Sequence, residues 1–160
     1  MKLRRANQHD FVFQLSPREQ ELLFDTLKLY PLVPAHHHRL TRSAAAQSEE
    51  NQHLLEAALA EQRAENRRHV EALLTAPERL QKYQTNFLLR LTPVEMEWLL
   101  QVLNDIRVGS WLELGEPDQD KPPQITGENF RFALALEVAA GFESVFLAAL
   151  GETESPDWLG

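Results

Sequence analysis

The chain has 160 residues, no cysteine and a net charge of −8 at pH 7. This length suits one domain that can bury a core of its own, and the lack of cysteine excludes disulfides and thiolate-based metal or catalytic sites. The negative charge argues against nucleic acid as the main partner, because phosphate binding needs clustered lysine and arginine.

The first 15 residues predict a β-hairpin. "KLRRA" and "FVFQLS" have the length of strands, and "NQHD" between them has the composition of a turn. Phe11, Phe13 and Leu15 alternate with Val12 and Gln14, so one face is apolar and must pack on another element. No apolar stretch follows the basic start, so it does not predict a secretory signal, and the lack of cysteine fits the reducing cytoplasm that we expect as the location.

Two helices are expected next. The first runs from Ser16 to the prolines at 31 and 34. The connector after it contains His36–His38, three adjacent imidazoles that cannot all bind one ion from regular structure, so we predict no metal site. A long helix is expected from about Ser48 to Thr75, and its polar middle, "EQRAENRR", is either solvated or an interaction face.

The second half predicts two more helices. "ERLQKYQT" predicts only a linker, and a short apolar run follows at residues 87–91. A third helix is expected from Thr92 to about Leu114, and a fourth from residue 126 or 127 to Gly151, after a proline-rich loop. The fourth is long enough to span a membrane, but Glu137 and Glu143 would each cost about 2.5–3.5 kcal/mol there. We therefore predict a buried core helix and no membrane association.

Together these elements predict a mainly α fold. We expect about four helices in a bundle-like single domain over residues 1–151, with a small N-terminal β-hairpin or short mixed sheet. Residues 152–160 are expected to form a polar C-terminal tail, in which Trp158 and Leu159 could dock on the body or bind a partner.

Two stretches, "LSPREQEL" and "LTPVEMEW", share one frame. Ser16 and Thr92 are predicted N-caps, each followed by proline at N1, and Glu19 and Glu95 at N3 complete two capping boxes. A carboxylate pair for acid–base or metal chemistry would explain only the glutamates. We therefore predict structural helix caps, and the short strands that precede them could pair in one small sheet.

The third helix carries three polar residues beside its apolar stripe: Asn104, Asp105 and Arg107. If Arg107 is buried it needs a carboxylate from elsewhere, and Glu137 is the first candidate, with Glu143 the second. Further acidic candidates are Glu21 and Glu97. The set predicts either an ion pair that fixes helix docking or, beside a groove, a site for an anionic ligand or partner.

The same stretch resembles the signature of a bacterial, mainly actinobacterial, family of unknown function: Leu-Thr, acidic residues, Trp-Leu, then Leu-Asn-Asp-Leu-Arg. The matching residues are Leu91, Thr92, Trp98, Leu99, Leu103, Asn104, Asp105, Ile106 and Arg107. The family has no assigned activity; its genes often lie near that of a Clp protease adaptor, and some members are labelled transcriptional regulators. Trp111 and Glu113 depart from the family pattern, which has a small residue and a base there.

We therefore expect a non-enzymatic cytoplasmic interaction or regulatory protein, without metal or cofactor, whose partner is a protein. A homodimer is one form of this expectation, and the resemblance implies a link to Clp-type proteolysis through gene context. One alternative is a ligand-binding protein or enzyme that uses Asn104, Asp105 and Arg107. Another is a transcriptional regulator, which would need a contiguous basic surface around Arg63, Arg67 and Arg68.

Overall fold

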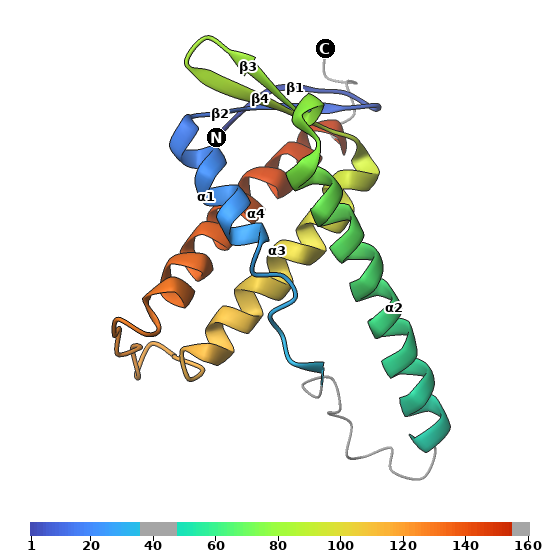
Figure 1. Ribbon diagram of the computed structural model, residues 1–160, viewed down its shortest axis with the longest axis vertical. Helices are drawn as coiled ribbons and strands as arrows, with labels where there is room; N and C mark the ends of the chain where they lie inside the picture. The colour runs from blue at the N-terminus through green and yellow to red at the C-terminus, as the bar shows by residue number, and fades with distance from the viewer. Residues whose placement is uncertain (36–47, 155–160) are drawn as a thin grey trace.

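The computed structural model describes residues 1–35 and 48–154 and shows a sheet packed on one side by helices (Figure 1). The predictions for His36–His38, Trp158 and Leu159 fall outside the described residues. In chain order the elements are β1 (Lys2–Ala6), β2 (Phe11–Leu15), α1 (Pro17–Leu27), α2 (Ser48–Thr75), a 3-10 turn (Pro77–Arg79), β3 (Leu80–Tyr83), β4 (Asn86–Leu91), α3 (Pro93–Glu113) and α4 (Phe130–Glu154).

The prediction of a mainly α, bundle-like fold is wrong, because four strands form a layer of their own and the class is mixed α/β. The sheet is also entirely antiparallel, not mixed. The error lies in β3, where the sequence predicts a linker. "LQKY" is an edge strand with three exposed residues, so it lacks the alternation of a half-buried strand. The segment is a strand because it pairs with β4 through a tight turn at Gln84, where φ is +55°.

The strand order is β1-β2-β4-β3. The two strands that feed the predicted caps, β2 and β4, are the central pair, with Phe11 opposite Leu91 and Phe13 opposite Leu89. These side chains point to the helices. Because a strand alternates its side chains between faces, the neighbours of these residues point away from the helices.

The core lies between this inner sheet face and the helices. The Phe13 ring meets the Phe146 ring of α4 edge to face, with centroids 5.0 Å apart. Burial of large apolar side chains is the main stabilising term of such a layer contact. The largest fully buried side chains are Phe11, Phe13, Phe146, Leu15, Leu23, Leu27, Leu89, Leu91, Met96, Leu99, Leu103 and Ile106.

Both predicted capping boxes are present. The Ser16 hydroxyl accepts the Glu19 N–H at 3.2 Å, and the Glu19 carboxylate accepts the Ser16 N–H at 3.2 Å. In the second box the Thr92 hydroxyl accepts the Glu95 N–H at 3.2 Å, and the Glu95 carboxylate accepts the Thr92 N–H at 2.8 Å. The frame that α1 and α3 share therefore starts helices, as its sequence predicts.

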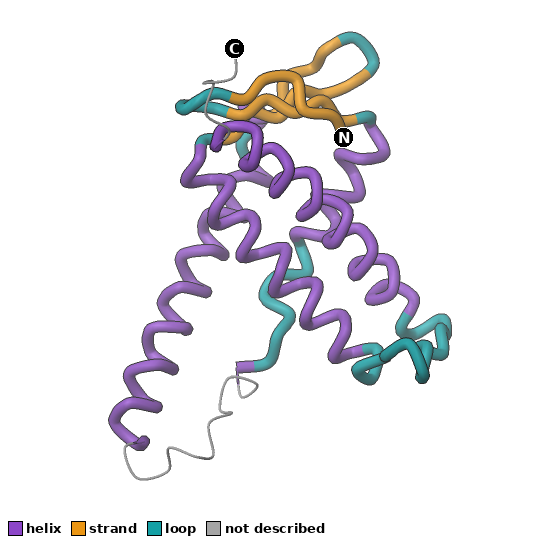
Figure 2. Tube along the Cα trace, turned by 180° about the vertical axis from the view of Figure 1, so that it is seen from behind, coloured by secondary structure: helices purple, strands orange, loops and turns teal. Residues whose placement is uncertain are grey.

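Helix α2 has its predicted bounds but is only partly packed. Val70 and Leu73, near its end, are buried, whereas Leu54 is 69% exposed. In both views the first half of the helix runs away from the body (Figures 1 and 2). The long helix is therefore anchored by its second half.

Helix α4 begins at Phe130, a few residues later than predicted, because Thr126 and Asn129 form a hydrogen-bonded turn before it. Its length and composition would allow it to cross a membrane, as would those of many core helices in soluble proteins. Only 28% of its most apolar window is buried, so it is less enclosed than the predicted core helix. Phe130 and Leu147 are among its exposed side chains.

Candidate functional site

The three polar residues predicted as a site on α3 do not form one cluster. Asp105 faces the segment that follows α1, whereas Arg107 faces α4 and holds Asn104 beside it. A helix turns about 100° per residue, so side chains two positions apart point in nearly opposite directions. The structure therefore divides the predicted site into two separate contacts.

Asp105 anchors the segment after α1. Its Oδ1 accepts hydrogen bonds from the backbone N–H groups of Leu32, at 2.7 Å, and Val33, at 3.2 Å. Arg63 of α2 lies 3.7 Å from Oδ2 and donates to the Val33 carbonyl at 2.5 Å. Because two backbone groups and one guanidinium already occupy it, this carboxylate holds α1, α2 and α3 together.

Arg107 pairs with Glu143, the second predicted partner, and not with Glu137, the first. Its Nε lies 3.4 Å from Glu143 Oε2 without hydrogen-bond geometry, and its Nη2 donates to Asn104 Oδ1 at 2.8 Å. Glu137 is exposed. At 3.6 residues per turn, the separation of six positions puts the two glutamates on different sides of α4, and only Glu143 faces α3. Burial raises the pKa of Glu143, and the nearby charge of Arg107 opposes this in part.

A different surface, on the far side of the sheet from the helices, gathers cations. Residues opposite one another in an antiparallel pair project to the same side. Arg5 is opposite Val12, Val12 is opposite Arg90, and Leu88 is opposite both Gln14 and Gln81. We call the surface made by Lys2, Arg5, Val12, Gln14, Gln81, Tyr83, Leu88 and Arg90 the basic sheet face.

No helix among the described residues covers the basic sheet face. The helices lie on the opposite side of the sheet in both views (Figures 1 and 2). The arginine side chains on it are accessible, with 52% of Arg5 and 62% of Arg90 exposed. Their charges are therefore available to a partner.

The charge of the chain is strongly divided. Residues 1–15 and 77–91, which form the four strands and the turn before β3, carry six cations and two anions, a net charge of +4. Because the whole chain has a net charge of −8, the other residues have a net charge of −12. The cations are Lys2, Arg4, Arg5, Arg79, Lys82 and Arg90, and the anions are Asp10 and Glu78.

Asp10 links two arginines across the basic sheet face. Arg5 Nη2 donates to Asp10 Oδ2 at 2.6 Å, and Arg90 Nε lies 3.7 Å from the same oxygen. Asn7 fixes the turn, because its Oδ1 accepts the N–H groups of His9 and Asp10, both at 2.8 Å. The hydrogen bond from Arg5 is the main cause of a lowered pKa at Asp10, so this carboxylate stays charged in mild acid.

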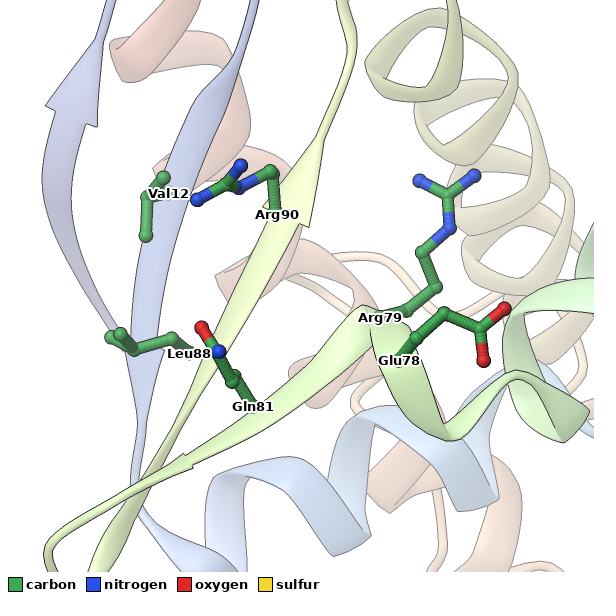
Figure 3. A pocket seen from close by; sticks show the side chains of 6 residues that line it. All are labelled: Val12, Glu78, Arg79, Gln81, Leu88 and Arg90. Carbon is green, nitrogen blue, oxygen red and sulfur yellow. The ribbon is translucent and has the colours of Figure 1, made fainter.

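A shallow cavity of about 230 Å³ opens on the same face (Figure 3). Val12 and Leu88 form its apolar part, and Arg90 extends over the strands beside them. Other lining residues are Glu78, Arg79 and Gln81. A second cavity, of about 220 Å³, shares Glu78 and Arg79 and reaches His69, which stacks on Trp98. Asn104, Asp105, Arg107 and Glu137 line neither cavity.

Sequence reasoning missed this face for a definite reason. "MKLRR" is visibly basic, but Arg90 lies far along the chain and joins it only through the pairing of β2 with β4. The net charge of −8 hides the division of charge between sheet and helices. A count restricted to the strand segments could have found it.

No family model matches the chain, and neither a curated protein nor a solved structure is significantly similar to it. Membership of the actinobacterial family therefore stays a prediction. Within residues 1–35 and 48–154, no three histidine, aspartate or glutamate side chains lie close enough together to hold a metal ion.

Proposed function

We propose that the protein is a non-enzymatic interaction protein that binds a negatively charged macromolecular partner through the basic sheet face. One observation carries this proposal: cations from β1 and β4 gather on a sheet surface that no described helix covers, in a chain whose remaining residues have a net charge of −12. Such a local field attracts anionic partners and orients them during encounter.

The form of the surface favours a macromolecule over a small substrate. Small-molecule sites are usually enclosed pockets of about 300–1,000 Å³. The cavity here is smaller and shallow, and its lining consists of one amide, two aliphatic side chains, two ion-paired arginines and the Glu78 carboxylate. These groups recognise shape and charge, and none is an activated nucleophile.

The alternative site at Asn104, Asp105 and Arg107 has less support. A ligand there would have to displace either the backbone of Leu32 from Asp105 or Glu143 from Arg107. Both contacts join elements of the fold, so their loss would also cost stability. The geometry gives these residues a part in holding the helices together.

The proposal is tested by reversing charge on the face. The variant Arg5→Glu/Arg90→Glu is compared with wild type and with Lys28→Glu/Lys121→Glu, which makes the same change in net charge at exposed positions away from the sheet. Anisotropy measured with three labelled anionic probes (an acidic peptide, a single-stranded oligonucleotide and phosphatidylserine vesicles) should show binding lost only in the first variant. If each probe binds the two variants with the same affinity, the proposal is wrong.

A further inference from the structure

The basic sheet face also indicates what kind of anion it binds. We infer that its partner is a short acidic segment of another protein, in which an aliphatic side chain lies next to the carboxylates. This inference rests on the proposed function and narrows it. Three features carry it: the size of the positive region, the side chains on it, and the position of Asp10.

The positive region is small and has an acidic surround. Strands lie about 4.8 Å apart, so four of them span roughly 15 Å. The rest of the chain carries a net charge of −12. A duplex or a membrane surface would extend beyond the sheet and meet that charge, because exposed charges act over a Debye length of about 8 Å in physiological salt. A segment of a few residues gains the attraction and avoids most of the repulsion.

The side chains on the face suit a peptide better than a nucleic acid. Single-stranded nucleic acids are held largely by bases that stack on several aromatic rings. Among the described residues of this face the one aromatic side chain is Tyr83, at the turn end of β3. The centre of the face is aliphatic instead: Val12 and Leu88 line a cavity of about 230 Å³. This is space for one aliphatic side chain, with Arg90 beside it (Figure 3).

Asp10 marks where a carboxylate of the partner would bind. Arg5 and Arg90 come from strands on either side of β2, yet both lie against the same Asp10 oxygen, at 2.6 and 3.7 Å. The pair is thus already arranged for a carboxylate. Asp10 competes with an incoming carboxylate for these guanidiniums, so its neutralisation should strengthen binding.

The experiment compares Asp10→Asn with Glu78→Gln. Both remove one negative charge near the cavity, but only Asp10 lies between the two arginines. The probe is a labelled peptide of alternating glutamate and leucine, measured by anisotropy, with circular dichroism to verify that each variant is folded. We expect Asp10→Asn to tighten binding by about tenfold, the equivalent of one charge-assisted contact. Glu78→Gln should tighten it much less.

Each result has a separate meaning. Equal effects of Asp10→Asn and Glu78→Gln would overturn the inference, because simple charge would then explain both. Tighter, Arg90-dependent binding of the oligonucleotide or the vesicles than of the peptide would overturn the partner class and leave the proposed function standing. If no anionic probe depends on Arg5 and Arg90, the proposed function and this inference both fail.

Discussion

Asp105 holds the backbone N–H of Leu32, 73 positions earlier in the chain, through a hydrogen bond of 2.7 Å. A carboxylate from the middle of α3 thus fixes the segment that leaves α1. The sequence predicts Asp105 as a binding residue, and the structure gives the same carboxylate a structural contact.

Replacing Asp105 should therefore destabilise the fold. Asp105→Ala leaves the N–H groups of Leu32 and Val33 without their acceptor, and we expect a loss of about 1–3 kcal/mol in the free energy of unfolding. Asp105→Asn keeps an acceptor oxygen and should cost less. The control is Asp25→Ala, which breaks an exposed ion pair with Lys28 and should cost about 0–1 kcal/mol. Urea unfolding checks this, and equal losses for Asp105→Ala and Asp25→Ala would contradict it.

Gly109 of α3 packs against Leu32, the residue whose backbone N–H binds Asp105. A Cβ at this position would lie 2.6 Å from Leu32 Cγ and 2.9 Å from the Leu32 carbonyl carbon, so Gly109→Ala should destabilise by about 1–3 kcal/mol. Gly141 is the matched control, since it also lies within a helix but an added Cβ would meet no atom within 4 Å beyond its chain neighbours and its own helix backbone. Gly141→Ala should raise stability by about 0.5–1 kcal/mol. Thermal unfolding that gave both variants the same sign would contradict this account.

Glu143 should make stability depend on pH. Folding raises its pKa above the ordinary value of 4.5, so the stability it contributes is full below pH 4.5 and is lost as pH rises through the higher folded-state value. Glu143→Gln lacks this loss. Relative to wild type, the variant should therefore gain stability as pH rises from 4.5 toward neutral.

The control for Glu143 is Glu137→Gln, the same chemical change at an exposed position of the same helix. Denaturant unfolding over a series of pH values compares the three proteins. The Glu137→Gln curve should stay close to that of wild type throughout. A stability difference between Glu143→Gln and wild type that stays constant with pH would show that burial does not govern this carboxylate.

Local sequence patterns predicted the local parts of the structure. The boxes at Ser16 and Thr92 each use residues within one turn, so the rule that predicts them needs no tertiary information. The paired runs of β2 and β4 were predictable too, since Phe11, Phe13 and Leu15 alternate on a buried face. The bounds of α2 followed from composition alone.

The pairing of β3 and the rotation of the helices against one another were not predictable from the sequence. Strand β3 has little apolar character, and it is a strand because it pairs with β4. The sequence therefore predicted a linker in its place, and the predicted fold class was wrong. The partner of Arg107 depended on how α4 is rotated against α3, which selected Glu143 over Glu137. The cations of the basic sheet face come from separate strands, and only the strand order brings Arg5 and Arg90 to one carboxylate.

The most direct test of the central claim is an exchange of charge between the basic sheet face and its ligand. Wild type and Arg5→Glu/Arg90→Glu are each titrated with the glutamate–leucine peptide and with a lysine–leucine peptide of equal length. If the face recognises a partner by charge, wild type should bind the acidic peptide, and the variant should lose at least about tenfold in that affinity and gain affinity for the basic peptide. Unchanged binding of both peptides in a folded variant would contradict the claim.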